Sequence, residues 1–229
     1  MGARATGSAL NALRGFALAR GLSLSDEQFQ RLSLYAQLVL EANPKVNLTA
    51  DAEPDALLLR HMADGLAAVA PLKARLAAAA RLADLGSGGG FIGAAIKIAW
   101  PEAEMTLIEG LKRKYEFLNA ASLKLGLKGL RVLKRRAGMD RFTAAESGFD
   151  AVVERALAPL PQSVEWAAPL AKAGGLVLAY QSAAPDPAEP ALAAALAKTG
   201  AKLIESYAYR LPAEDKDRTL AIFETGSDR

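Results

Sequence analysis

The feature that most constrains the fold of this chain is a glycine-rich stretch at residues 82–93, LADLGSGGGFIG. A short apolar run ends in the carboxylate Asp84, and Gly86, Gly88 and Gly90 follow before a run with a helical pattern. Glycine is needed where the backbone takes a positive φ or where a ligand approaches it closely. The stretch therefore predicts a strand, a tight turn and the start of a helix.

A second acidic residue follows at the spacing expected of a nucleotide site. The apolar run 105–108 ends in Glu109, about 20 residues after the turn, where a carboxylate would contact ribose hydroxyls. The turn and Glu109 together predict a site for an adenosine-containing cofactor. A turn that binds nothing would explain one or two glycines, but not this cluster together with Glu109.

Two cofactor classes fit the glycines. Gly88, Gly90 and Gly93 match G-x-G-x-x-G, a dinucleotide fingerprint whose turn receives a pyrophosphate. Starting at Asp84, the stretch matches D-x-G-x-G, which resembles the S-adenosylmethionine turn of Rossmann-like methyltransferases. Asp84 would repel phosphates, whereas it suits a ligand that carries an ammonium and a sulfonium. We therefore favour S-adenosylmethionine, and a nicotinamide-dependent oxidoreductase is the alternative.

Composition excludes several kinds of chemistry. The 229 residues include no cysteine and one histidine, His61, which excludes disulfides, thiolate sites and a multi-histidine metal centre. No apolar run reaches the ~18 residues that would span a bilayer, and the first 22 residues lack a signal-peptide pattern. We expect a cytoplasmic protein with no metal and no membrane partner. The net charge of +3 permits a nucleic-acid partner without proving one.

The first 75 residues predict a tail and a helical extension. Ser25 and Gln28 form a capping box, which marks a helix start. Arg60, His61 and Asp64 fall on or near one helix face, which we interpret as a surface with one half-buried histidine. The sequence predicts a disordered tail at 1–8 and helices at 10–20, at 26–42 with its end set by Asn43-Pro44, and at 54–70 with its end set by Pro71.

From residue 81 onward, strand-like runs alternate with helical ones. This alternation predicts a doubly wound α/β fold with helices on both faces of a mostly parallel sheet. The last two strand-like runs suit an antiparallel hairpin at the sheet edge. The seven expected strands are 81–85, 104–109, 130–134, 149–154, 174–180, 201–211 and 218–224, and the expected helices are 91–99, 111–125, 161–170 and 188–199.

Polar side chains stand where these strands end. Ligands of doubly wound sheets bind at the carboxyl ends of the strands. We therefore expect the site at that edge, where the sequence places Asp84, Glu109, Arg136, Arg155 and Gln181.

Several stretches, in this order, together resemble one family. They are Asn47-Leu48-Thr49-Ala50, Arg60-His61 with Asp64, the glycine turn, Leu107-Ile108-Glu109-Gly110 with Lys112-Arg113-Lys114, Arg136-Ala137, Arg155 to Leu160, and Asp217-Arg218-Thr219-Leu220. Over roughly residues 25–225 the chain resembles the bacterial small-subunit ribosomal RNA methyltransferase G family. The resemblance implies a Rossmann-like class I S-adenosylmethionine-dependent methyltransferase that methylates N7 of a guanine in 16S rRNA.

The resemblance also implies an organisation and a set of partners. We expect a helical extension at residues 1–75 packed on a methyltransferase domain at residues 76–229. The expected partner is 16S rRNA, free or within the 30S subunit, and we expect the chain to act as a monomer.

Roles carry over from the family residue by residue. The matching cofactor positions are Asp84, Gly86, Gly88, Gly90, Phe91, Glu109, Ala137, Gly138 and Arg155. Positions expected to face RNA are Lys112, Arg113, Lys114, Arg136 and Arg218, with a solvated basic face as the alternative. Arg155 is also the candidate catalytic residue, because its fork of donors could orient the cofactor or guanine O6. The alternative is a strand-end arginine paired with Glu154 or Asp150.

The chain departs from the family pattern at five positions. Gly89 and Ile92 replace prolines of the turn, Gly110 replaces a serine, Gln181 replaces a lysine, and Thr219 replaces a histidine. These departures concern the substrate more than the cofactor. A methyltransferase with another substrate and a non-catalytic RNA-binding relative are therefore the alternatives.

Overall fold

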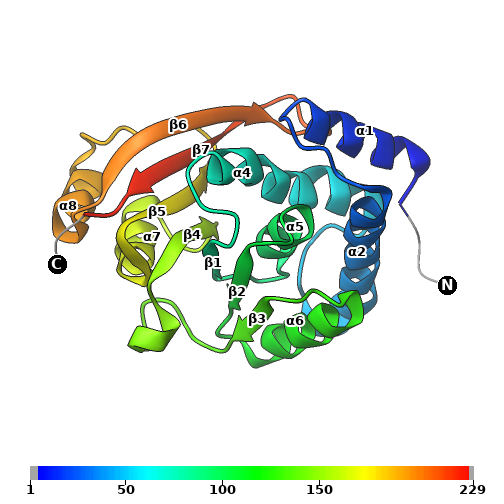
Figure 1. Cartoon of the computed structure of the whole chain (residues 1–229), viewed down its shortest axis with the longest axis horizontal. Coiled ribbons are helices and arrows are strands. Elements are labelled where there is room, and N and C mark those ends of the chain that lie inside the picture. The colour runs from blue at the N-terminus through cyan, green and yellow to red at the C-terminus, as the bar shows by residue number, and fades with distance from the viewer. Residues whose placement is uncertain (1–4, 227–229) are drawn as a thin grey trace.

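The computed structural model describes residues 5–226, which form a three-layer α/β fold (Figure 1). Seven strands within these residues form a sheet in the order β3-β2-β1-β4-β5-β7-β6. Strands β1 to β5 pair with one another in parallel, and β7 is antiparallel to both β5 and β6. The predicted doubly wound sheet and its edge hairpin are confirmed.

The observed elements lie within a few residues of the expected ones. The strands are β1 Arg81–Leu85, β2 Glu104–Ile108, β3 Leu130–Leu133, β4 Phe149–Arg155, β5 Ala171–Gln181, β6 Lys202–Arg210 and β7 Asp217–Glu224. The α-helices are α1 Gly7–Leu18, α2 Asp26–Val46, α3 Pro54–Ala56, α4 Ala63–Lys73, α5 Phe91–Ala99, α6 Lys112–Leu125, α7 Leu160–Ala167 and α8 Pro190–Thr199. A π-helical segment, Leu57–Met62, joins α3 to α4, and short 3-10 helices lie at Ala144–Glu146 and Ala168–Leu170.

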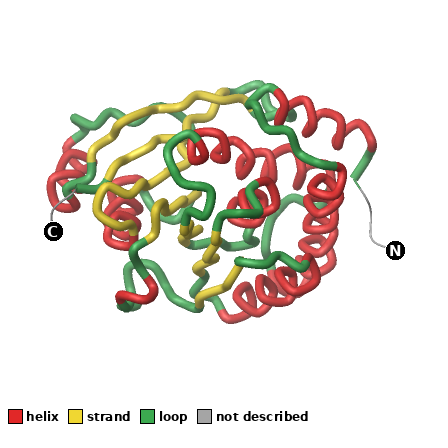
Figure 2. Tube along the Cα trace, viewed as in Figure 1, coloured by secondary structure: helices red, strands yellow, loops and turns green. Residues whose placement is uncertain are grey.

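Alternating side chains of the strands divide the core into two layers, and helices cover both faces of the sheet (Figure 2). On β1, Leu82 packs in the layer formed with the extension and α5, whereas Ala83 and Leu85 pack in the layer formed with α7 and α8. Each of these side chains is fully buried. The short apolar strands are therefore buried on both faces, as is usual for a parallel sheet.

The helical extension packs on helix α5, which covers one face of the sheet. A Cβ on Gly65 of α4 would lie 2.6 Å from Ala95 Cβ and 2.9 Å from the Ile92 carbonyl oxygen of α5. The two helices therefore approach each other more closely than any larger residue would permit. The domain boundary at residue 75 stays a prediction.

The predicted tail at residues 1–8 is wrong for its last residues. Thr6 caps α1, and its backbone amide and hydroxyl both donate to the Asp55 carboxylate, at 2.8 and 2.7 Å. This contact ties the start of α1 to α3, so the helix begins at Gly7. Residues 1–4 lie outside the described residues.

The prolines do not end the helices where the sequence predicts. Helix α2 continues through Pro44 and α4 through Pro71, each for two more residues. The Asn43 side chain accepts from the amides of Leu48 and Thr49, at 2.7 and 3.0 Å, which stabilises the end of α2. In both helices proline stands in the last turn. Proline removes one hydrogen bond to the carbonyl four residues before it, and the helix needs to continue for only two residues beyond it.

No helix within residues 5–226 is both long and apolar enough to cross a membrane.

Candidate active site

The glycine turn joins β1 to α5 as predicted. Gly86, Gly88 and Gly90 have φ of +73°, +56° and +71°, a conformation that other residues rarely adopt. The Gly86 amide donates to the Ile108 carbonyl oxygen at 2.9 Å, which fixes the turn to the end of β2. A Cβ on Gly88 would meet nothing closer than the Gly86 carbonyl oxygen at 3.9 Å, so the backbone there faces open space.

Glu109 connects the end of β2 to this turn. Its Oε2 accepts from the Gly88 amide at 2.9 Å and its Oε1 from the Leu111 amide at 2.7 Å. The side chain is buried, with 7% of its surface exposed. The predicted ribose position and the turn are therefore held together by one carboxylate.

The departure at Gly110 has a steric reason. A Cβ on Gly110 would lie 2.9 Å from Arg136 Cβ and 3.2 Å from Arg136 Cα. The loop after β3 therefore approaches the loop after β2 at a point where only glycine fits. This contact also places Arg136 beside the basic run that begins at Lys112.

Asp84 lies beneath the turn. Its Oδ2 accepts from the Gly93 amide of α5 at 3.0 Å, and the residue is 2% exposed. Burial raises the pKa of its carboxyl to about 6, against the opposing effects of the Gly93 hydrogen bond and of Arg155. Asp84 thus lies next to the predicted cofactor turn as a poorly solvated carboxylate.

The helical extension reaches the turn from the other side. The Tyr35 hydroxyl of α2 donates to the Gly89 carbonyl oxygen at 2.7 Å. Phe91, the first residue of α5, stacks on His61 with ring centroids 4.4 Å apart. The extension therefore supports both the middle and the end of the turn.

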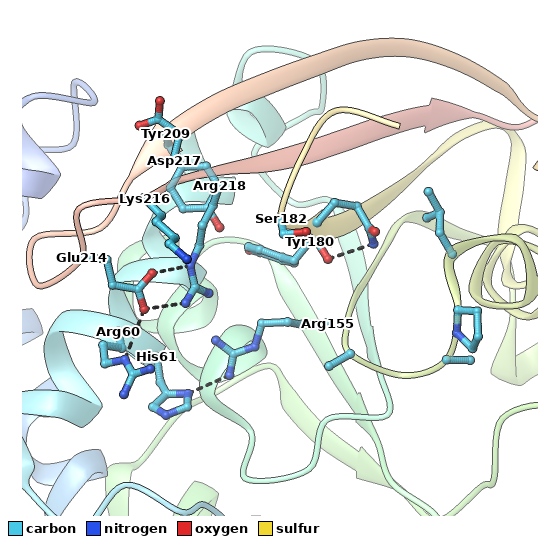
Figure 3. A pocket seen from close by; sticks show the side chains of 15 residues that line it. Arg60, His61, Arg155, Tyr180, Ser182, Tyr209, Glu214, Lys216, Asp217 and Arg218 are labelled. Atoms are coloured by element: carbon cyan, nitrogen blue, oxygen red, sulfur yellow. Dashed lines mark hydrogen bonds and ion pairs between the residues drawn. The ribbon is translucent and has the colours of Figure 1, made fainter. Parts of the chain in front are cut away.

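Next to the turn lies a cavity of about 680 Å³, which we call the arginine cavity (Figure 3). Its lining comes from the π-helical segment, from the ends of β4 and β5, and from the loop between β6 and β7. Charged side chains point toward one another across it (Figure 3). The lining residues include Arg60, His61, Arg155, Tyr180, Gln181, Tyr209, Glu214, Lys216 and Arg218.

The Asp64 carboxylate binds three side chains that line this cavity. Its Oδ2 accepts from Arg155 Nη1 at 2.6 Å and from Arg218 Nη1 at 2.7 Å, and its Oδ1 accepts from the Tyr209 hydroxyl at 2.7 Å. The Tyr180 hydroxyl donates to its backbone carbonyl oxygen at 3.0 Å. Asp64 is 0% exposed. The predicted surface face is therefore wrong for Asp64, which is buried against the strand ends, whereas Arg60 is exposed and His61 is half-buried as expected.

Arg155 does not pair with Glu154 or Asp150, the alternative drawn from sequence. Besides Asp64, its Nη2 lies 2.8 Å from His61 Nδ1, and His61 Nε2 lies 2.7 Å from Asp51 Oδ2. Burial and then the neighbouring guanidinium lower the pKa of His61. A neutral imidazole that accepts at Nδ1 and donates from Nε2 satisfies both contacts. Arg155 is thus fixed by two residues of the extension.

Arg218 is held on its other side by Glu214. Its Nε and Nη2 donate to the two carboxylate oxygens of Glu214 at 2.8 and 2.6 Å. The hydrogen bonds and charge of Arg218 keep the pKa of the Glu214 carboxyl below its ordinary value. Arg60 Nε donates to the same carboxylate at 3.2 Å. The structure therefore brings Arg155 and Arg218 together in one network.

The other predicted residues lie along the β2 and β3 side of the same edge. Gly138 has a φ of +72°, and a Cβ there would lie 2.3 Å from Trp166. Its neighbour Ala137 is partly buried against the α7 layer. Lys112 and Arg113 are exposed and Lys114 is half-buried, at the start of α6. Arg136 and this run lie on the β2 and β3 side, whereas Arg218 lines the arginine cavity.

No group of three or more histidine, cysteine, aspartate or glutamate residues in the described part of the chain is arranged to hold a metal ion.

Comparison with known proteins identifies the family. A family model described as rRNA small subunit methyltransferase G matches residues 28–206. The chain belongs to the rRNA small subunit methyltransferase G family. A protein of that name from Desulfitobacterium hafniense is 34% identical over 90% of this chain and 84% of its own length. Another, from Rubrobacter xylanophilus, is 38% identical over 95% of this chain and 84% of its own length.

Solved structures agree on the fold. A SAM-dependent methyltransferase from Aquifex aeolicus superposes with a TM-score of 0.52 at 16% identity, over 75% of this chain and 93% of that chain. The fold of this rRNA small subunit methyltransferase G family member is that of the class I S-adenosylmethionine-dependent methyltransferases. The resemblance inferred from the ordered motifs is confirmed.

Sequence reasoning missed several residues of the site in this family member. The sequence predicts Tyr180 and Tyr209 only as strand residues, and Glu214 lies between two predicted strands. Tyr180 on β5, Tyr209 on β6 and Glu214 in the loop between β6 and β7 reach the site because these strands meet the extension at one edge. The spacing of the sequence carries no signal for contacts between residues as distant as Asp64 and Tyr209.

Proposed function

We propose that this chain transfers a methyl group from S-adenosylmethionine to N7 of a guanine in small-subunit ribosomal RNA. The observation that carries the proposal is the position of the arginine cavity beside the glycine turn. Arg155 and Ala156 line the cavity, and the next residue, Leu157, lies against Gly86 of the turn. A donor on the turn and a base in the cavity would therefore meet at the end of β4.

Residues of the turn suit the methyl donor. Gly88 presents open backbone, and Glu109 has carboxylate oxygens next to it that would accept from ribose hydroxyls. Ala137 and Gly138 would border the adenine, and Phe91 would close the turn. Asp84 provides negative charge beneath the cationic end of the donor.

The reaction requires position more than acid–base chemistry. Bound S-adenosylmethionine supplies an electrophilic methyl group on a sulfonium. Guanine N7 carries an unprotonated lone pair, so no residue must remove a proton before attack. His61 is already engaged by Arg155 and Asp51. Holding the two reactants in line can lower the barrier by about 7–11 kcal/mol.

Arg155 is suited to orient the base. A guanidinium fork matches the O6 and N7 edge of guanine, and here its donation would go to O6 because N7 must remain free for the methyl group. Asp64 and His61 hold this guanidinium in place from behind. Arg155 is therefore the proposed catalytic residue, and its orientation is set before the base arrives.

The RNA would be held by cations along the rim of the site. Lys112, Arg113, Lys114 and Arg136 flank the cofactor side, and Arg218 with Lys216 flanks the cavity. Such cations would bind phosphates. We also propose that the chain works as a cytoplasmic monomer.

Labelled S-adenosylmethionine offered to 30S particles, to naked small-subunit rRNA and to large-subunit rRNA tests this function. We expect label in small-subunit RNA, recovered after digestion as N7-methylguanosine. The Arg155→Ala variant should transfer at least 100-fold more slowly if it loses a charge-assisted hydrogen bond and the orientation it gives. Donor and RNA binding without transfer would identify a non-catalytic relative, and label on another atom would contradict the proposal.

A further inference from the structure

Asp51 is a carboxylate in the loop before α3 to which the proposed mechanism assigns no role. Its two oxygens bind two side chains of the π-helical segment. Oδ1 accepts from Arg60 Nη1 at 3.0 Å, and Oδ2 lies 2.7 Å from His61 Nε2. Asp51 does not line the arginine cavity, so it can influence a base bound there only through another side chain.

The loop that carries Asp51 is held by hydrogen bonds of its own. The Asn43 side chain accepts from the Thr49 amide at 3.0 Å and donates to the Thr49 carbonyl oxygen at 2.8 Å. The Asp51 amide donates to the Thr49 hydroxyl at 3.1 Å. This hydroxyl lies 3.5 Å from His61 Nε2, so the Asp51 carboxylate is the closer partner of that nitrogen. Asp51 therefore has a fixed position beside His61.

These contacts belong to a closed ring of hydrogen bonds at the arginine cavity, part of which is drawn in Figure 3. The ring consists of carboxylates, guanidinium groups and one imidazole. In order, its members are Asp64, Arg155, His61, Asp51, Arg60, Glu214 and Arg218. A carboxylate only accepts and a guanidinium only donates. His61 stands between Arg155 and Asp51, so it alone must accept on one side and donate on the other.

One neutral tautomer of His61 satisfies both of its neighbours. Arg155 Nη2 lies 2.8 Å from Nδ1 and has no lone pair to offer, so Nδ1 is the acceptor. Nε2 then carries the proton and donates it to the Asp51 carboxylate. In general, the hydrogen bond made by one ring nitrogen decides the protonation of the other. In the reverse tautomer, Nδ1–H would face Arg155, and two donors would repel each other.

We propose that Asp51 is a positioning residue for Arg155 and acts through the tautomer of His61. The inference rests on the proposed function, in which Arg155 orients the guanine. Phe91 stacks on His61 with ring centroids 4.4 Å apart, which holds the plane of the imidazole. By accepting from Nε2–H, Asp51 keeps the lone pair of Nδ1 directed at Arg155. The guanidinium then keeps the direction that it needs to donate to O6.

NMR spectra of the two ring nitrogens read this tautomer directly, because His61 is the one histidine of the 229 residues. The measurement is made at about pH 8, where an imidazole is neutral. We expect the wild-type Nδ1 resonance to have the shift of an unprotonated nitrogen and the Nε2 resonance that of a protonated one. No substrate is needed, so the result is independent of methyl transfer.

Asp51→Asn should reverse the tautomer. The Arg60 guanidinium only donates, so the amide oxygen stays with Arg60 and the amide nitrogen faces His61 Nε2. Nε2 becomes the acceptor, and the proton moves to Nδ1, against Arg155. We expect methyl transfer to slow by roughly 10-fold to 100-fold, the range of one hydrogen bond to a charged group. Affinity for S-adenosylhomocysteine should stay within about twofold, because the turn is unchanged.

Asp51→Ala separates this role from simple support of the loop. Alanine removes the acceptor but supplies no donor, and the His61 side chain is 19% exposed, so Nε2–H can donate to water. We expect the tautomer to persist and methyl transfer to slow by less than about 10-fold. The isosteric amide should therefore be more harmful than the truncation. If Asp51 only supported the loop, the order would be the opposite.

Removal of Arg60 should restore the tautomer of the amide variant. In Asp51→Asn with Arg60→Ala, the amide oxygen is free to accept from Nε2–H, so the wild-type spectrum should return. Because Arg60 lines the cavity, this double variant is judged by its spectrum and not by its activity. Asp55→Asn is the matched control, since Asp55 binds Thr6 and should leave both spectrum and methyl transfer unchanged. Thermal unfolding checks that every variant is folded.

The other outcomes overturn the assignment. An unchanged tautomer in Asp51→Asn would mean that Asp51 does not control His61, and a reversed tautomer with wild-type transfer would mean that Arg155 does not need it. Slower transfer by Asp51→Ala than by Asp51→Asn would assign Asp51 to the loop alone. If wild-type protein methylates rRNA while Asp51→Asn keeps the tautomer, this inference alone fails. If wild-type protein binds the donor but transfers no methyl group to rRNA, the proposed function fails whatever the spectra show.

Discussion

At the scale of single residues, Asp64 is the side chain that connects the two arginines of the site. One carboxylate oxygen receives Arg155 and Arg218, which stand on different strands, and the other receives Tyr209. Two guanidinium groups would otherwise repel each other across the arginine cavity. Asp64 therefore sets both the distance between these arginines and their direction.

Replacing Asp64 should be costly for stability. Asp64→Ala would leave Arg155 and Arg218 without their shared partner in a largely buried place, so we expect the free energy of unfolding to fall by about 3–5 kcal/mol. Urea unfolding measures this change. Asp26→Ala is the control, because Asp26 is exposed where it pairs with Arg14, and should cost less than about 1 kcal/mol. A cost for Asp64→Ala no larger than the control would contradict the role described.

Because burial raises the pKa of Glu154, the stability of the protein should depend on pH in an unusual way. Its pKa is raised from 4.5 to about 7, so the folded state holds this proton more tightly than the unfolded state. The stability it contributes is present below about pH 4.5 and is lost as the pH rises through about 7. Glutamine does not ionise. The difference in free energy of unfolding between Glu154→Gln and wild type should therefore change by about 2–3 kcal/mol in favour of the variant between pH 5 and pH 8. Unfolding of both proteins at the two pH values measures this change. A difference independent of pH would contradict the raised pKa.

At the scale of elements, the sequence predicted strands better than helix ends. Short buried runs such as β1 and β2 leave little freedom in where a strand begins. Pro44 and Pro71 predicted helix ends, but both helices continue beyond them. Asn43 stabilises the loop after α2, and Leu72 of α4 is buried in the core. Local sequence patterns predict that a helix is present, whereas tertiary contacts determine the residue at which its last turn ends.

The approach of α4 to α5 depends on Gly65. Gly65→Ala would place a Cβ within 2.6 Å of Ala95 Cβ, which forces the helices apart, and should destabilise the protein by about 1–3 kcal/mol. Thermal unfolding measures the effect. Gly15→Ala is the matched control inside α1, where a Cβ would meet nothing within 4 Å. It should stabilise by about 0.5–1 kcal/mol, because alanine favours helix. Destabilisation of equal size in both variants would show that contact with α5 is not the cause.

At the scale of the whole molecule, the ordered motifs predicted the fold and the turn, but not the arginine cavity. The turn is a local feature, and its glycines and Glu109 lie within one strand–helix–strand unit. The cavity joins the extension to the last strand, and contacts such as that of Asp64 with Arg218 span most of the chain. Sequence spacing cannot predict such contacts, since they follow from the strand order around β4, β5 and β7.

Binding of RNA should depend on salt through the rim cations. Neutralising Lys112, Arg113 and Lys114 together as alanines should reduce the slope of log K against log salt by up to about 2, at about 0.7 for each single-stranded phosphate contact. A filter-binding titration at several salt concentrations measures the slope. The matched control is the triple alanine variant of Lys172, Lys198 and Lys202, cations away from the strand ends that form the site. Equal slopes in the two triple variants would contradict a rim of specific contacts.

The most direct test of the account is a crystal structure of the protein with S-adenosylhomocysteine. We expect the ribose hydroxyls at Glu109, the adenine beside Ala137 and Gly138, and the sulfur directed into the arginine cavity at Arg155. A product bound elsewhere, or bound on the turn with its sulfur directed away from Arg155, would contradict the account.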